Sequence, residues 1–224
     1  MAPYIELKNV SCFTDDGRAL FENADLTLES NQKALIIAPI ASGKSVLIRL
    51  IAGLVKPDVG EVTVLGQDVG KLSAEELNVL RQKMGFVFHD NILISNLKTV
   101  ENVALPLLYH SRLSYEDAMT KAVDLLGRTG FKGNYWGLPG LLPLYAKKEV
   151  AIARALVLKP KIVVCENLWD GLTAEEGAHV SRLLLDYHSS SEDNLLIVTA
   201  LTDSEAELLK PDRIIRIEGN RIFQ

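Results

Sequence analysis

The chain has 224 residues, of which 48% are hydrophobic and 24% charged, and this composition is sufficient for one globular domain with a full core. Its net charge of -5 provides no overall attraction for nucleic acid, so we expect no nucleic-acid partner. The first residues lack the pattern of a secretory signal, and no stretch reaches the roughly 20 apolar residues of a membrane span. We therefore expect a cytoplasmic protein that reaches a membrane only through a partner.

The first third of the chain predicts strands and one helix on either side of a short loop. Alternation of apolar and polar residues indicates half-buried strands, and a fully apolar run before the loop indicates a central strand that is buried on both faces. The predicted elements are strands at 4–8, 24–29, 33–38 and 61–65, and a helix at 46–54.

The remaining two thirds predict a mostly helical segment between two α/β segments. Ser73 and Glu76 form a capping-box pattern that predicts a helix from residue 73 to about 83. The other predicted elements are strands at 85–89, 162–165 and 195–199, helices at 99–109, 114–128, 147–158 and 173–188, and a hairpin of 213–217 with 221–223. We expect a single α/β domain whose core is 1–88 and 159–224, with a helical subdomain inserted at about 89–158.

The loop between the central strand and the first helix carries the clearest motif of the chain. It reads Ala38-Pro-Ile-Ala-Ser-Gly-Lys-Ser45, the ending of a phosphate-binding P-loop. In such a loop backbone N–H groups and the helix N-terminus face an anion. Ala38 stands where the motif has its first glycine.

Several segments together resemble the ATP-binding subunits of ABC transporters over nearly the whole chain. They are the Gly43-Lys44-Ser45 loop with the helix after it, and the segments 99–106, 150–156 and 212–215. The resemblance implies an α/β fold with a P-loop NTPase, RecA-like core, the inserted helical subdomain and an N-terminal antiparallel β region. It also implies ATP and Mg²⁺ as ligands, a homodimer or a heterodimer with another ATP-binding subunit, and docking beneath a membrane-spanning subunit.

Besides Ala38, two further positions at the P-loop depart from the family pattern. Ala41 replaces a glycine, and if it adopts a positive φ its Cβ costs ~1–2 kcal/mol and crowds a phosphate. Val46 replaces a hydroxyl, whereas the lysine and one serine survive. Phe13 has two open interpretations, an aromatic that stacks on adenine or a core residue. The nucleotide-binding candidates are Ala38, Ala41, Ser42, Gly43, Lys44, Ser45, Val46 and Phe13.

The positions that resemble the catalytic residues of the family are also altered. Glu166 and Asn167 stand where the family has an aspartate and a glutamate, so Ser45 and Glu166 are the Mg²⁺ candidates, and an amide replaces the general base. Ala200 replaces a histidine that contacts the γ-phosphate, and its methyl group offers no donor. His89 replaces a glutamine; it is either a sensor of the site or a surface histidine at a strand end.

The signature loop of the family is replaced by bulky residues. The family has a Leu-Ser-Gly-Gly-Gln run, which aligns here with Leu142, Pro143, Leu144, Tyr145 and Ala146. In the family this loop lies against ATP bound to the opposite subunit, and side chains of this size leave no room for that contact. We expect these residues to serve apolar packing, either within the subdomain or against a partner.

A short apolar stretch corresponds to the groove that receives a coupling helix of the membrane subunit in the family. Its candidate docking residues are Ile92, Leu93, Ile94 and Leu97. Burial of the same residues inside the subdomain is the other open interpretation.

Two functions are weighed from these residues. The first is a structural or regulatory subunit of a transport complex with weak or no ATP hydrolysis, because Asn167, Ala200 and the segment 142–146 change together. The alternative is a divergent but active ATPase in which Lys44, Ser45 and Glu166 carry Mg-ATP; the run 101–107 is similar to ATPases of lipid-transport complexes. A P-loop kinase fits the loop but not the segments after it.

Overall fold

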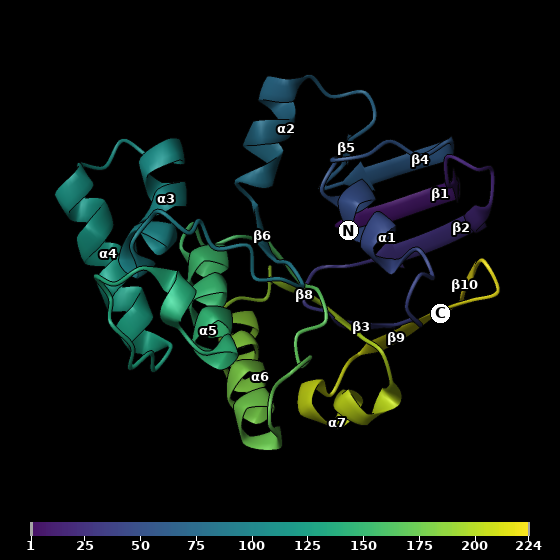
Figure 1. Ribbon diagram of the computed structural model, residues 1–224. Coiled ribbons are helices and arrows are strands. Elements are labelled where there is room, and N and C mark those ends of the chain that lie inside the picture. Colours follow the sequence, from purple (N-terminus) through teal and green to yellow (C-terminus); the bar gives the residue numbers. More distant parts are fainter. Residues whose placement is uncertain (1, 224) are drawn as a thin grey trace.

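The computed structural model describes residues 2–223, which form two β-sheets with helices around them (Figure 1). The larger sheet has the strand order β10-β9-β3-β8-β7-β6 and is parallel except for the hairpin strand β10. Its strands are β3 (Lys33–Ile37), β6 (Met84–Val87), β7 (Ile162–Cys165), β8 (Leu195–Ala200), β9 (Arg213–Glu218) and β10 (Arg221–Phe223). Every residue of β7 and β8 is buried, as expected for parallel strands covered on both faces.

The smaller sheet is antiparallel, with the order β2-β1-β4-β5, and confirms the predicted N-terminal β region. Its strands are β1 (Ile5–Phe13), β2 (Ala19–Leu28), β4 (Val59–Val64) and β5 (Gln67–Asp68). Helix α1 (Lys44–Ile51) joins the two sheets, because its buried Leu47, Leu50 and Ile51 belong to one apolar cluster with residues of both. The P-loop at its start is therefore anchored on a rigid core.

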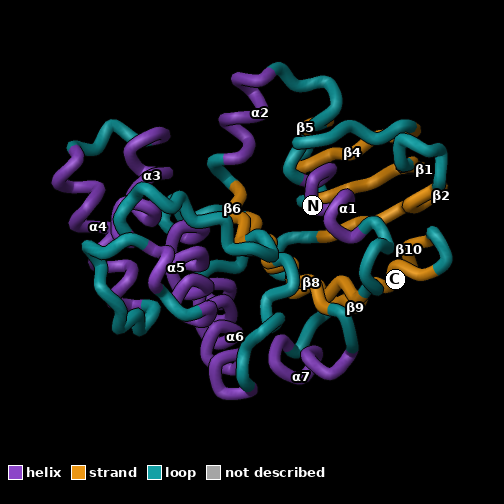
Figure 2. Tube along the Cα trace, viewed as in Figure 1, coloured by secondary structure: helices purple, strands orange, loops and turns teal. Residues whose placement is uncertain are grey.

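Most of the remaining helices, α3 to α6, fall into two groups that share α5 (Figure 2). Helix α3 (Thr99–His110) and helix α4 (Tyr115–Arg128) lie away from both sheets and share an apolar cluster with α5 (Leu144–Leu156). Helix α5 also packs with α6 (Ala174–Ser189) against the larger sheet. The other helical pieces are α2 (Ala74–Arg81), α7 (Ala206–Leu209) and the 3-10 turns η1 (Pro139–Leu141) and η2 (Asp203–Glu205). The boundaries proposed at residues 89 and 158 remain a prediction.

The structure confirms the predicted order of elements and corrects some of their ends. Helix α1 begins at Lys44 and ends at Ile51, so it lies two to three residues earlier than predicted. Helix α5 begins at Leu144 because Pro143, with φ -63°, is its N-cap and accepts the first helical hydrogen bond from Lys147 N at 3.0 Å. Sequence periodicity missed β5, η1, η2 and α7, which have two to four residues each.

Candidate nucleotide site

The P-loop leaves the end of β3 and enters α1 through two left-handed residues. Ala41 has φ 63°, so the positive φ considered for this position is present and its Cβ is strained. Gly43 has φ 88° and caps α1, and a Cβ there would lie 3.1 Å from side-chain atoms of Leu20 and Phe21. Position 43 therefore requires glycine for two reasons, its left-handed backbone and the lack of space for a Cβ beside Leu20 and Phe21.

A cavity of about 520 Å³ lies over this loop. Ser42 lines it, and Ser42 Oγ is buried without a hydrogen-bond partner among the described residues. An orphaned hydroxyl in a loop of backbone N–H groups fits a phosphate ligand, which would accept from it. The lining residues are Thr14, Arg18, Leu20, Pro39, Ile40, Ala41, Ser42, Gly43, Lys44, Ser45, Val46, His89, Asn167, Asp170 and Leu201.

One wall of this cavity contains residues that the sequence motifs did not indicate. Thr14 and Arg18 come from the turn between β1 and β2, and Leu201 follows β8. Phe13 is 40% exposed and is not one of the lining residues named above; its backbone N donates to Asp58 Oδ2 at 2.9 Å. The turn itself was visible in the sequence, but its proximity to the P-loop depends on how the two sheets pack.

Lys44 is buried, with 6% of its surface exposed, and its ammonium contacts three protein oxygens. Lys44 Nζ donates to Asn167 Oδ1 at 2.7 Å, to Ala200 O at 3.2 Å and to Ala38 O at 3.3 Å. The end of β8 therefore meets the lysine through a backbone carbonyl, while the Ala200 methyl group provides no donor. These three contacts place carbonyl and carboxamide oxygens around the buried ammonium.

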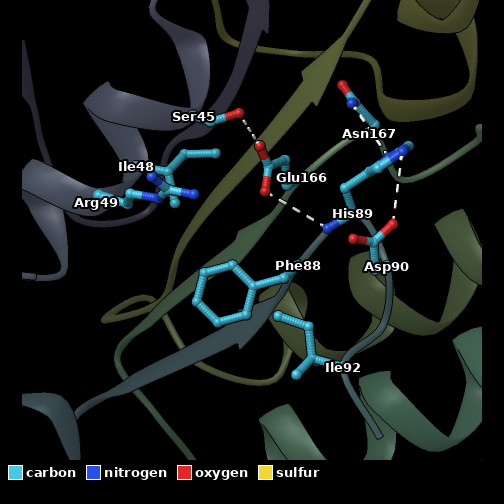
Figure 3. A pocket seen from close by; sticks show the side chains of 9 residues that line it. All are labelled: Ser45, Ile48, Arg49, Phe88, His89, Asp90, Ile92, Glu166 and Asn167. Carbon is cyan, nitrogen blue, oxygen red and sulfur yellow. Dashed lines mark hydrogen bonds and ion pairs between the residues drawn. The ribbon is translucent and has the colours of Figure 1, made fainter. Parts of the chain in front are cut away.

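A second cavity, of about 250 Å³, adjoins the first beside Ser45 (Figure 3). The Ser45 hydroxyl donates to Glu166 Oε1, and His89 N lies 3.5 Å from Glu166 Oε2. One hydroxyl and one carboxylate are suited to Mg²⁺ but are too few to hold it alone, so phosphate oxygens would complete the coordination. The described residues contain no cluster of three or more His, Cys, Asp or Glu that could hold a metal.

Asn167 occupies the centre of a polar chain across the site. Its Nδ2 lies 3.3 Å from His89 Nδ1, and the same ring nitrogen is 3.6 Å from Asp170 Oδ2 (the contact between Asn167 and His89 is drawn in Figure 3). His89 thus faces the site and is 45% exposed at its side chain. The placement favours the sensor interpretation over an isolated surface histidine, although the sensing role stays a prediction.

The residues aligned with the signature loop begin α5 and pack within the chain. Leu142 contacts the cluster of α3 and α4, Ala146 is buried in it, and the Tyr145 ring stands edge-on to His179 with centroids 5.8 Å apart. Leu144 is 43% exposed, and its Cδ2 lies 2.5 Å from the place where Gly171 would carry a Cβ. Apolar packing inside the molecule accounts for most of this segment.

The candidate docking segment is divided between the surface and the core. Ile92 is 56% and Ile94 39% exposed, whereas Leu93 packs into the two clusters that meet at α5. Leu97 is half-buried. Ile92 has φ 36°, a rare backbone state for a β-branched residue, and Arg154 holds it by donating to Ile92 O at 2.7 Å.

A model of the family described as ABC transporter matches residues 21–168. The chain belongs to the ABC transporter family. It is similar to the lipoprotein-releasing system ATP-binding protein LolD of Psychrobacter arcticus, at 32% identity over 89% of this chain and 90% of that protein. A probable ribonucleotide transport ATP-binding protein, Mkl of Mycobacterium bovis, is 29% identical over 80% of the chain, which spans 50% of Mkl.

A solved ABC cassette has nearly the same fold. The dimeric ATP-binding cassette MJ0796, bound to ADP and phosphate in a post-hydrolysis state, superposes with a TM-score of 0.89 at 28% identity, over 98% of this chain and 97% of that one. This likeness confirms the ABC ATP-binding fold with its P-loop core and antiparallel β region. Among the described residues, no helix is sufficiently long and apolar to cross a bilayer.

Proposed function

We propose that this ABC ATP-binding subunit is a structural or regulatory component of a membrane transport complex and hydrolyses ATP slowly or not at all. The observation that carries the proposal is the position of Asn167, the second residue after β7, whose Oδ1 lies 2.7 Å from Nζ of the P-loop lysine. A carboxamide there can orient a water but cannot accept its proton, and losing a general base lowers the rate by roughly 10²–10⁴-fold. Bound Mg²⁺ would supply charge stabilisation at the phosphates, and this chain provides Ser45 and Glu166 for it.

The proposal includes a second ATP-binding subunit, the same chain or another, and a membrane-spanning partner, with the chain at the cytoplasmic membrane face. Dimeric MJ0796 supports the first of these, and the names of LolD and Mkl support a role in transport. Exposed Ile92 and Ile94 support docking of the partner at this segment.

The alternative is a divergent ATPase that energises transport. The contact between Ser45 and Glu166 favours it, because both groups are in place for Mg²⁺. The relative named for lipoprotein release supports a lipid-linked cargo for this alternative.

The test is ATP turnover by the purified protein with Mg²⁺, compared with Asn167→Glu and Lys44→Ala. We expect wild-type turnover at least about 100-fold below the ~10 s⁻¹ typical of enzymes, and an increase in Asn167→Glu, which restores a carboxylate. In cells, Lys44→Ala should leave the assembled complex and its phenotype intact. Wild-type turnover near 10 s⁻¹, abolished by Lys44→Ala together with transport, would establish the alternative.

A further inference from the structure

The ammonium of Lys44 is held by protein oxygens from the P-loop, from the residues after β7 and from the end of β8. An ammonium carries three N–H groups, and the oxygens of Asn167, Ala200 and Ala38 lie within 2.7–3.3 Å of Nζ. The contact to Asn167 is the shortest of the three and comes from a side chain, so it can move without displacing the backbone. A phosphate oxygen therefore reaches Lys44 most readily at the place of the Asn167 carboxamide.

The carboxamide is held toward Lys44 by Thr199. Asn167 N donates to Thr199 Oγ1 at 2.9 Å, and the Thr199 hydroxyl lies 3.3 Å from Asn167 Oδ1, to which it donates. Thr199 is completely buried in β8, and Asn167 has a left-handed backbone with φ 46°. Reversing the amide would point its NH₂ group at an ammonium, so the oxygen must face Lys44.

We infer that Asn167 competes with nucleotide for Lys44, so that the nucleotide-free chain inhibits its own phosphate site. Both residues line the cavity of about 520 Å³ over the P-loop, where a nucleotide phosphate would lie. A bound phosphate has to displace the carboxamide oxygen, which costs a hydrogen bond to a charged group before the new contact is made. This inference deepens the proposed function and rests on its nucleotide site.

The experiment is titration of Mg-ATP and Mg-ADP onto the protein by isothermal calorimetry. Asn167→Gly and Asn167→Ala both remove the carboxamide, and glycine also suits the left-handed backbone. We expect Kd to fall about tenfold in both, the effect of one competing bond to a charged group. Thr199→Val, which keeps Asn167 and the shape of residue 199 but removes the hydroxyl, should tighten binding about two- to threefold.

The matched controls are Asn23→Gly and Asn23→Ala, because Asn23 is exposed, has φ 49° and lies on β2. They should leave Kd unchanged while reporting any cost of substitution at a left-handed position. Unchanged or weaker binding in both Asn167 variants, or no measurable binding in any protein, would overturn the inference.

A second measurement observes the lysine itself. In ¹⁵N-lysine-labelled protein without nucleotide, the Lys44 ammonium, identified by its loss in Lys44→Ala, should exchange slowly with water and faster in Asn167→Gly. Equal exchange in the two proteins would contradict the inference. Neither the binding measurement nor the exchange measurement depends on ATP hydrolysis. Rapid ATP turnover by the wild type would therefore refute the proposed function and leave this inference standing.

Discussion

At the scale of single residues, several non-glycine residues in or beside the site have a left-handed backbone. Ala41, Asn91, Ile92 and Asn167 have φ between 36° and 63°, and such positions cost of order 1–3 kcal/mol each. The surroundings hold them in place: Arg154 donates to the carbonyls of residues 91 and 92, and Thr199 binds residue 167. Ala41, Ile92 and Asn167 line the two cavities, so strained backbone is maintained at the walls of the candidate site. Composition alone does not reveal these backbone angles.

At the same scale, the buried carboxyl group of Glu149 makes the free energy of unfolding depend on pH. It is 3% exposed on α5, and burial raises its pKa, an effect only partly offset by Tyr145 and by His179, whose Nε2 lies 3.6 Å from Glu149 Oε1. Between the unfolded and folded pKa values the native state therefore binds more protons than the unfolded state. The free energy of unfolding then falls as the pH rises through the folded pKa.

Replacement of Glu149 by glutamine mimics its protonated form and removes this cost. We expect Glu149→Gln to be more stable than wild type at pH 7.5, with the difference shrinking as the pH falls toward 4.5, the ordinary pKa. Urea unfolding across this pH range measures it, and exposed Glu175→Gln is the control. A difference that stays constant with pH would contradict the assignment.

At the scale of elements, α5 is the helix that connects the parts of the chain. It begins with the residues aligned to the signature loop and contributes to two apolar clusters, the one shared with α3 and α4 and the one shared with α6. It also passes over β6 at close range. A Cβ at Gly85 of β6 would lie 2.4 Å from Ala155 O and 3.0 Å from Pro160 Cγ. The close approach of helix and strand thus requires a glycine at this position.

Gly85→Ala should lower the free energy of unfolding by about 1–3 kcal/mol, because the helix backbone has to shift. In a thermal melt this corresponds to a decrease in Tm of about 2–4 °C per kcal/mol for a chain of this length. Gly140→Ala is the matched control, since a Cβ there meets nothing within 4 Å. Equal melting temperatures for the two variants would show that α5 can move away from β6 without cost.

At the scale of the whole molecule, the candidate docking segment lies beside the nucleotide site. Ile92 lines the cavity of about 250 Å³ next to Ser45 and Glu166, and also presents 56% of its surface outward. One short segment therefore lines a cavity together with the candidate Mg²⁺ residues and also lies at the surface.

Ile92→Ala combined with Ile94→Ala should release the chain from the membrane fraction of cells that contain its natural partner. Losing two exposed apolar anchors weakens such an interface by about tenfold or more. The Tm should change little, since both side chains are substantially exposed. Val79→Ala, at an equally exposed residue of α2, is the control, and full membrane retention of the double variant would exclude docking here.

The sequence by itself determined the fold class, the order of the main elements and the position of the P-loop. Local periodicity, turn residues and the Gly43-Lys44-Ser45 motif depend on neighbours in the chain, so they can be read directly. The same holds for the replaced residues at 166, 167 and 200, whose places follow from the ends of predicted strands.

Only the tertiary structure decided which of these residues touch. Lys44 and Asn167 are 123 positions apart, and their contact exists because β3, β8 and β7 are neighbours in one parallel sheet. The cavity walls at Thr14 and Arg18 likewise depend on the packing of the two sheets. Strand order and sheet packing arise from contacts between distant segments, which local patterns do not encode, and these contacts made the P-loop lysine a partner of Asn167.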